Sequence, residues 1–423
     1  MERAQLVTRF ASLFTGTVVV RAAAFAASVV VIRLVGPSDF GAFSVGLTLA
    51  VLFALCVNPG MDDLLVREVA RAPQPHLGWL VGDAILLRAP ALPLGLLGGI
   101  LADRVTQTGG LYVALGLYGA GHTYLMLLGA VMRGRGSMHT QSLLLSAHMT
   151  TIALVSIVGC FLTHSVVLVA GVYAAATVAA VAIGYTLLLR KGIRPMYAWR
   201  APVWKHQARV SIPFGVTLVG LLLLDRQALV WVAILRGQTD AGWFSSVYNL
   251  VLALTNLPMV AAAVAMPHLA RLAHSHLAEL RRLSLHLLRI TLAIAIVSAA
   301  ALHILADPLV LYLFGPEYAD SAAVLRLLAF SVPPFFLTFV LIGILEAVDQ
   351  QKVCATAMLQ ALVIAAPLAG AAVWRFGLDG AAIGYVIAHV VLTVLLLWRT
   401  RQVLRTKGVV HDVRVPRPGV AHG

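Results

Sequence analysis

Charged side chains inside apolar stretches are the residues of this 423-residue sequence with the clearest chemical potential, and the first of them is Arg21. A guanidinium in hydrocarbon costs at least about 2.5 kcal/mol, so Arg21 must face water or a partner. It can bind a pyrophosphate or a uronic carboxylate through two parallel hydrogen bonds. A structural hydrogen-bond anchor between helices is the alternative, and the sequence leaves both roles open.

Asp225 and Arg226 lie near the centre of a second apolar stretch, residues 212–235. A buried aspartate can be protonated or can bind a cation, whereas Arg226 can attract an anionic headgroup. Adjacent helical residues point about 100° apart, so we do not expect these two side chains to pair. Asp225 could instead lock helices together, for example through Arg21.

Pairs of weaker polar candidates repeat at helical spacing, so the members of each pair share a helix face. Such stripes could line a path for a sugar, or they could make contacts between helices. The pairs are Tyr118 with His122, Gln141 with His148, and Asn249 with Asn256. We predict substrate contacts for His122, His148, Asn249 and Asn256.

The composition excludes a soluble globular protein. Hydrophobic residues make up 60% and charged residues only 11%, against about 25% charged in soluble domains. Mean hydropathy is +0.92. The net charge of +14 does not indicate a nucleic-acid partner, because basic residues of a polytopic protein collect in cytoplasmic loops and meet anionic membrane lipid there.

Apolar stretches of about 20 residues predict an all-α polytopic membrane protein with about twelve transmembrane helices in two parallel six-helix lobes. The predicted organisation is an N-terminal lobe (1–189), a basic cytoplasmic linker (190–211), a C-terminal lobe (212–398) and a basic, disordered cytoplasmic tail (399–423). Residues 269–288 are predicted to form an amphipathic helix on the inner leaflet. Spans are expected at 13–35, 42–58, 80–101, 111–131, 140–162, 166–189, 212–235, 242–266, 285–306, 322–345, 351–374 and 377–398.

Basic residues fall almost wholly on one side of these spans. The opposite loops hold only Arg104, Arg236 and Arg375. An even number of spans places both termini on the same side, and the positive-inside rule makes that side cytoplasmic.

The sequence predicts no enzyme, no cofactor and no metal site. The loops are too short for a catalytic domain, and no GxxxxGK[ST] phosphate loop occurs. Cys56, Cys160 and Cys354 lie in apolar runs without a CxxC spacing. Asp62 and Asp63 could form a metal-binding acidic pair of a glycosyltransferase, but no DxD partner accompanies them.

An internal repeat supports the division into two lobes. Residues 34–44 and 235–245 share the pattern LxGx[ST]DxGxFS at an offset of 201 residues. Leu-Leu-Arg at 86–88 recurs at 287–289 with the same offset. Because the offset spans six helices, the halves are parallel repeats, and a substrate is expected between them.

Four motifs occur in a specific order and spacing along the chain. They are LVGPSDFGAFS at 34–44, GMDDLLVREVAR at 60–71, LFGPEY at 313–318 followed by VLRLL at 324–328, and GAAIGY at 380–385. Together they resemble the polysaccharide (Wzx-type) flippases, whose superfamily also holds multidrug and toxin extrusion antiporters and lipid II flippases. The resemblance covers about residues 10–400.

This resemblance implies two six-helix lobes around a central cavity in a bacterial cytoplasmic (inner) membrane. It implies alternating access that moves an undecaprenyl-pyrophosphate-linked oligosaccharide from the inner to the outer leaflet for surface polysaccharide export. Other polysaccharide-assembly membrane proteins would be partners. The lipid II flippases of this superfamily have a fourteen-helix arrangement, whereas this sequence predicts twelve spans. Lipid II is therefore the less expected cargo.

Three other functions remain open on the sequence. A small-molecule or drug antiporter of the same superfamily would couple to a proton or sodium ion and would depend on Asp225. A membrane enzyme would need a carboxylate or histidine constellation at one face, which the sequence lacks. A non-transporting scaffold of polysaccharide assembly would need no charges within spans. The two midspan arginines favour an anionic lipid-linked cargo.

Overall fold

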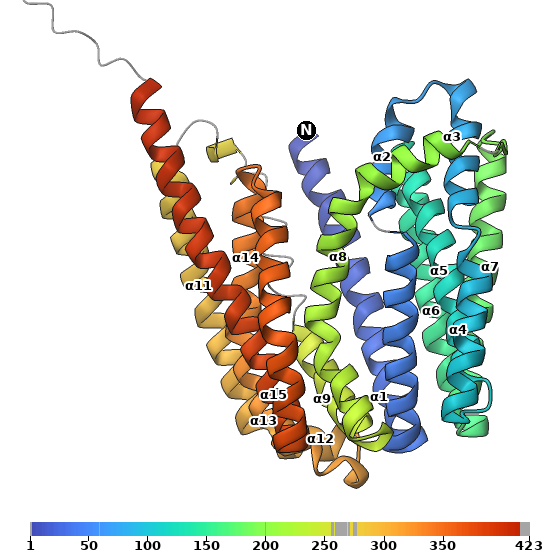
Figure 1. Cartoon of the computed structure of the whole chain (residues 1–423), viewed down its shortest axis with the longest axis vertical. Helices are drawn as coiled ribbons and strands as arrows, with labels where there is room; N and C mark the ends of the chain where they lie inside the picture. Colours follow the sequence, from blue (N-terminus) through green and yellow to red (C-terminus); the bar gives the residue numbers. More distant parts are fainter. Residues whose placement is uncertain are drawn as a thin grey trace, which may run out of the picture. The chain divides into compact units, whose positions relative to one another are not determined.

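The chain is almost wholly helical in the computed structural model, which describes residues 2–58, 60–198, 200–254, 258, 269, 271–273 and 277–414 (Figure 1). Two short 3-10 turns, η1 (Pro316–Tyr318) and η2 (Ala329–Ser331), interrupt the α-helices. The α-helices are α1 (Glu2–Val57), α2 (Met61–Arg71), α3 (Gln74–Leu87), α4 (Ala91–Thr106), α5 (Leu111–Gly134), α6 (Met138–Thr163), α7 (Val166–Arg190), α8 (Ala201–Leu235), α9 (Gln238–Leu254), α11 (Leu277–Ile304), α12 (Ala306–Leu313), α13 (Ser321–Leu328), α14 (Val332–Ala347) and α15 (Gln351–Arg414).

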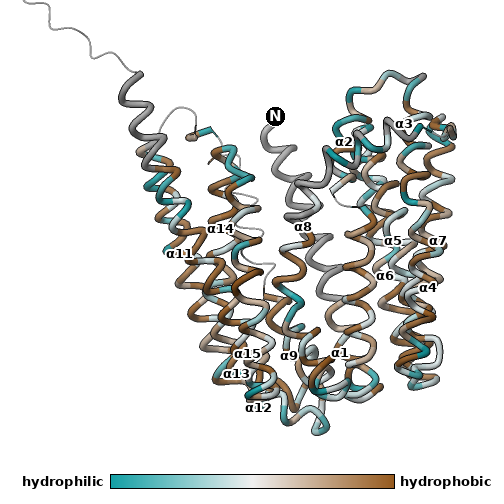
Figure 2. Tube along the Cα trace, in the orientation of Figure 1, coloured by the Kyte–Doolittle hydropathy of each residue, from teal (hydrophilic) through white to brown (hydrophobic). Residues whose placement is uncertain are grey.

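Eight helical segments of the described chain are long and apolar enough to cross a membrane. Two of them, Ala24–Val57 and Gln351–Leu404, contain a break and supply two spans each. The breaks lie at Gly36 (φ 76°) and Gly377 (φ 61°), where a positive φ favours glycine. Helices α8 and α9 bring the total to about twelve. Figure 2 shows apolar residues along the spans and polar residues at many of their ends. The predicted all-α polytopic membrane fold is confirmed.

Two compact units divide the chain. Unit one comprises Met1–Arg226, Arg236–Ser246 and Leu311–Tyr318, and unit two comprises the rest. In unit one, α5 packs against α4 and α7, and α6 packs against α1 and α7. In unit two, α14 packs against both α11 and α15 (Figure 1).

The two copies of the repeated turn lie against each other within unit one. A methyl group on Gly41 would sit 1.8 Å from the Gln238 carbonyl oxygen, and one on Gly242 would sit 1.8 Å from the Pro37 carbonyl oxygen. These contacts are equivalent, because 37 and 41 map onto 238 and 242 by the offset of 201. The LxGx[ST]DxGxFS pattern therefore keeps glycine where the two backbones touch.

Residues 311–318 also pack on these turns. The Tyr318 hydroxyl donates to the Ile32 carbonyl at 3.0 Å, and the Trp243 indole donates to the Glu317 carbonyl at 2.9 Å. Burial of the Tyr318 ring, together with the carboxylates of Glu317 and Asp39, raises the pKa of the Tyr318 hydroxyl. That hydroxyl therefore remains a protonated donor.

Two segments are helical where the sequence predicts none, and a third belongs to a different helix from the one predicted. Helix α8 begins at Ala201, so half of the predicted linker is helical, and α15 continues to Arg414, within the predicted disordered tail. Residues 277–288 belong to the spanning helix α11 instead of a separate amphipathic helix on the inner leaflet. Once a helix is nucleated, each further residue adds a hydrogen bond at little cost. In α15 the helix can continue to Arg414 because no proline interrupts the chain between Pro367 and Pro416.

Candidate functional site

Asp225 and Arg226 form an ion pair in α8, with 3.7 Å between Arg226 Nε and an Asp225 carboxylate oxygen. The expectation that adjacent residues do not pair was wrong, because both side chains are long enough to bend toward each other from neighbouring helix positions. Their side chains are 16% and 26% exposed, respectively. Arg226 thus combines a position nine residues before the end of α8 with a partly accessible guanidinium.

Two predicted site residues lie outside the described side chains. Arg21 falls within helix α1, but its side chain is not described, and Asn256 is not described at all. Asn249 lies in α9 with an intermediate exposure. The roles of these three residues stay predictions.

His122 and His148 lie in one polar cluster inside unit one. The Thr177 hydroxyl donates to the Tyr173 carbonyl at 2.7 Å, so His148 Nε2, 2.9 Å away, must donate to that hydroxyl. The His122 ring packs 5.6 Å from Tyr118, which meets Tyr173 edge to face. Among the described residues, neither Nδ1 atom has a hydrogen-bond partner. His148 is only 3% exposed, and it contributes to the wall of a pocket of about 360 Å³ between α6 and α7.

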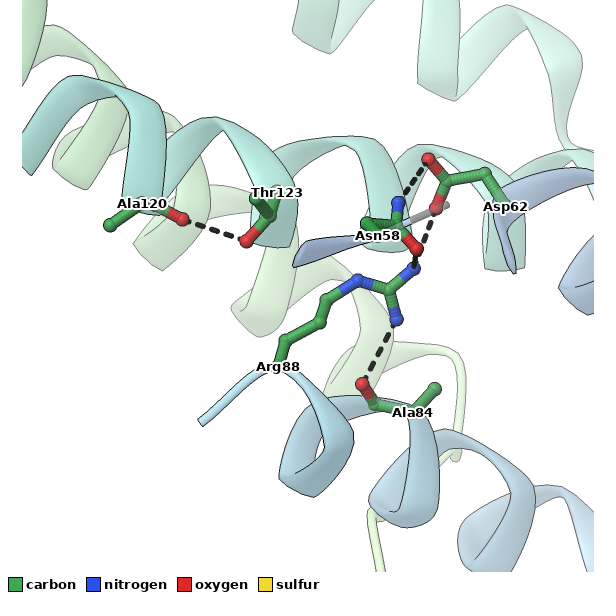
Figure 3. Close-up of polar contacts among 6 residues, drawn as sticks. All are labelled: Asn58, Asp62, Ala84, Arg88, Ala120 and Thr123. Carbon is green, nitrogen blue, oxygen red and sulfur yellow. Dashed lines mark hydrogen bonds and ion pairs between the residues drawn. The ribbon is translucent and has the colours of Figure 1, made fainter. Parts of the chain in front are cut away.

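A closed ion-pair network surrounds Arg88, which is fully buried in the turn between α3 and α4 (Figure 3). Its guanidinium donates to Asp62 at 2.8 Å, to Asn58 at 2.6 Å and to the Ala84 carbonyl at 2.9 Å. Asn58 in turn donates to the second Asp62 oxygen at 2.7 Å. Asp62 therefore serves Arg88, and no group of three potential metal ligands occurs in the described chain.

A second network closes over Asp83 in α3, which is 1% exposed. Arg200 forms an ion pair with the carboxylate, and the Trp204 indole donates to it at 3.1 Å. The Arg200 guanidinium also lies 5.1 Å from the centre of the Trp79 ring. Asp83 thereby anchors the connection between α7 and α8 to α3.

Sequence reasoning missed both networks. Arg88 was noted only as a basic residue and as part of the repeated Leu-Leu-Arg at 86–88, and Asp83 drew no attention although it lies within a predicted span. One signal was available in the sequence, because a charge within a span must find a partner. The basic linker at 190–211 offers both an arginine, Arg200, and a tryptophan, Trp204. The partners lie 117 residues apart in the case of Asp83 and Arg200, so spacing could not identify them.

These three arrangements differ in what they can do. The Arg88 and Asp83 networks satisfy their charges inside the protein and are suited to holding helices together. The Asp225–Arg226 pair is accessible, and an anion that binds Arg226 must compete with the Asp225 carboxylate. Protonation or cation binding at Asp225 would remove that competition, so the pair can link an anionic ligand to an ion.

A model of one known protein family matches most of this sequence. The family model described as "Polysaccharide biosynthesis protein" matches residues 6–273, well over half of the chain. No curated protein sequence is detectably similar to the chain.

Solved structures establish the fold. An inward-facing multidrug resistance MATE family transporter of the MOP superfamily has a TM-score of 0.73 at 14% identity, over 90% of this chain and 95% of its own. The lipid II flippase MurJ has a TM-score of 0.73 at 13% identity, over 92% and 87%. A MOP superfamily transporter from Pyrococcus furiosus has a TM-score of 0.57 at 13% identity, over 93% of both chains. The chain is therefore a multi-pass membrane protein with the twelve-helix fold of the MATE transporters.

Proposed function

Because the chain belongs to the polysaccharide biosynthesis protein family, we propose that it flips an undecaprenyl-pyrophosphate-linked oligosaccharide from the inner to the outer leaflet of a bacterial cytoplasmic membrane. Its fold is that of MOP-superfamily transporters, which include a lipid flippase. The export of a surface polysaccharide requires such a step, since the sugar is too polar to cross hydrocarbon unaided.

The observation that carries this proposal is the partly exposed guanidinium of Arg226 in the middle of α8. A pyrophosphate offers paired oxygens that match the two parallel donors of a guanidinium. In a site of low dielectric constant this interaction is stronger than in water. Arg21 is proposed as a second cation for the same headgroup, and Asn249, Asn256, His122 and His148 as contacts to the sugar.

Asp225 gives the proposal a coupling step. In the free protein its carboxylate pairs with Arg226 at 3.7 Å. The arrival of an anionic headgroup at Arg226 displaces that carboxylate, which then takes up a proton or a sodium ion. Release of the cargo on the outer side restores the ion pair and releases the ion there, so cargo and ion bind together and leave together during alternating access.

A cation-coupled antiporter of small molecules is the second candidate. The specific observation in its favour is the same midspan acid, Asp225, and the similarity of the fold to MATE transporters. Such a transporter would bind a cationic compound at Asp225, with Arg226 as the group displaced.

The test is the flipping of a fluorescent undecaprenyl-pyrophosphate oligosaccharide in proteoliposomes that contain the full-length protein. We expect Arg226→Gln to lower the rate about tenfold or more, the order expected from one lost charge-assisted hydrogen bond. Asp225→Asn should remove any stimulation by a proton or sodium gradient. Arg21→Gln should lower the rate as Arg226→Gln does.

The matched control is the pair Arg236–Asp240, 3.2 Å apart where the chain passes from α8 to α9, in which Arg236 is 51% exposed. Arg236→Gln and Asp240→Asn should leave the rate within about twofold, since this pair lies at the end of the span and its arginine reaches water. Normal flipping by Arg226→Gln would exclude this site, and transport of a cationic dye in place of the lipid would favour the antiporter.

A further inference from the structure

Unit two contains a pocket of about 310 Å³ between α11, α14 and α15. Its volume lies within the range of small-molecule sites. Most of its wall is aliphatic, as a site for a hydrocarbon chain requires. The apolar lining consists of Leu285, Leu288, Leu341, Ile344, Leu397 and Leu404.

One end of this pocket is cationic. Arg281 and Arg401 both line it, and both are exposed. The Arg281 guanidinium donates to the Leu404 carbonyl, which holds it at the rim. The lining residues include no aspartate or glutamate, so neither guanidinium is neutralised by a carboxylate of the pocket wall.

Two buried hydroxyl groups belong to the same pocket. Ser284 and Thr400 are 3% and 6% exposed, and both line the pocket. Neither hydroxyl has a hydrogen-bond partner among the residues that the structure describes. Buried polar groups are normally satisfied, so these hydroxyls indicate a ligand with hydrogen-bond acceptors at this position.

We propose that this pocket binds an anionic membrane phospholipid, with the phosphate between Arg281 and Arg401 and one acyl chain along the aliphatic wall. The hydroxyls of Ser284 and Thr400 donate to the phosphate or glycerol ester oxygens. The distribution of basic residues places this end of the helices at the inner leaflet, where anionic phospholipids meet basic protein surfaces. None of the lining residues is a proposed cargo contact, and the proposal does not depend on which cargo is carried.

The experiment measures lipid retention by native mass spectrometry of the purified full-length protein, titrated with phosphatidylglycerol or with phosphatidylcholine of the same chains. We expect preferential retention of phosphatidylglycerol, reduced about tenfold in Arg281→Gln/Arg401→Gln, since the phosphate loses charge-assisted hydrogen bonds. The near-isosteric pair Ser284→Ala/Thr400→Val should reduce retention several-fold. Arg282→Gln, which changes an exposed arginine that does not line the pocket, is the matched control and should stay within about twofold.

A melting temperature for each variant distinguishes loss of the site from loss of the fold. Equal retention of the two phospholipids, or equal retention by the parent and the double-arginine variant, would overturn the proposal. The proposal would also be overturned if the double-arginine variant lost bound undecaprenyl phosphate but kept phosphatidylglycerol, because the pocket would then bind the cargo lipid. Failure of flipping with intact phosphatidylglycerol retention would contradict the proposed function alone.

Discussion

Asp83 in unit one and Ser284 in unit two occupy equivalent places in the internal repeat, yet their surroundings are opposite. Asp83 is covered by Arg200 and Trp204 from the connection that follows α7. Ser284 lines an open pocket, and the arginines at its rim, Arg281 and Arg401, have no carboxylate in the pocket wall. The same place in the repeat is therefore a closed anchor in one unit and a cationic pocket in the other.

Five residues further along, the contrast is repeated. Arg88 is fully buried and bound to Asp62, whereas Arg289, its equivalent at the offset of 201, is exposed in the continuous helix α11. Pro90 explains the difference, because it lacks an N–H and the chain turns at residues 88–90 between α3 and α4. The turn directs Arg88 into the protein, while the uninterrupted helix directs Arg289 outward.

Two parallel repeats can therefore keep equivalent helix positions and still differ in whether the charges at those positions are paired inside the protein or exposed. In unit one, Arg88 pairs with Asp62 and Asp83 pairs with Arg200, and the second pair holds the connection between the two sets of six spans. Unit two leaves cations at its surface, where lipid can reach them.

The largest expected effect comes from breaking the Arg88 network. Arg88→Gln should lower the free energy of unfolding by about 3 kcal/mol, because the buried Asn58 and the partly buried Asp62 carboxylate, 23% exposed, lose their cation. Chemical denaturation in detergent measures this value. Arg289→Gln is the matched variant of unit two and should change it by less than about 0.5 kcal/mol, as exposed substitutions do. Equal losses would show that the two units do not differ in this way.

A smaller effect is expected from Asp83. Asp83→Asn should lower the free energy of unfolding by about 2 kcal/mol, because the ion pair with Arg200 is lost but Arg200 is 35% exposed and can reach water. Limited proteolysis at the connection around residues 191–200 should become faster, since its anchor is weakened. The control is Asp307→Asn, which removes an exposed ion pair with Arg326 in unit two. Unchanged proteolysis in Asp83→Asn would contradict the anchoring role.

The smallest effect is expected when Ser284 of unit two is replaced by aspartate, the residue that unit one has at the equivalent position, Asp83. Ser284→Asp adds a carboxylate to the pocket that Arg281 and Arg401 line, at a position only 3% exposed. Its attraction to the exposed arginines is offset by its desolvation, so the free energy of unfolding should change by less than about 1 kcal/mol. The same variant should lose phosphatidylglycerol retention, since its carboxylate competes with the phosphate. A clear loss of stability would mean that neither arginine reaches the position of Ser284.

Much of the fold could be predicted from the pattern of residues. The apolar periodicity predicted a polytopic helical protein with about twelve spans, and the repeated LxGx[ST]DxGxFS turn predicted a relation that the Gly41 and Gly242 contacts display. Helix ends were harder, because Ala201 and Arg414 extend helices into polar sequence where composition alone favours a loop.

The candidate site was only partly predictable. Asp225 and Arg226 stood out because charges within apolar runs are rare, but their mutual ion pair was not expected. Asp83 escaped notice because its partners, Arg200 and Trp204, are more than a hundred residues away. Ser284 and Thr400 carry no charge, so nothing in the sequence distinguished them from ordinary helix hydroxyls.

The sequence by itself determined that this chain must lie in a membrane as helices, since its apolar stretches match the hydrocarbon core in length and every backbone polar group there must bond within its own helix. The tertiary structure alone decided which charges are closed off and which remain open. That outcome depends on which helices meet at Asp83, Arg88 and Ser284, and contacts between distant segments are set by packing in three dimensions instead of by spacing along the chain.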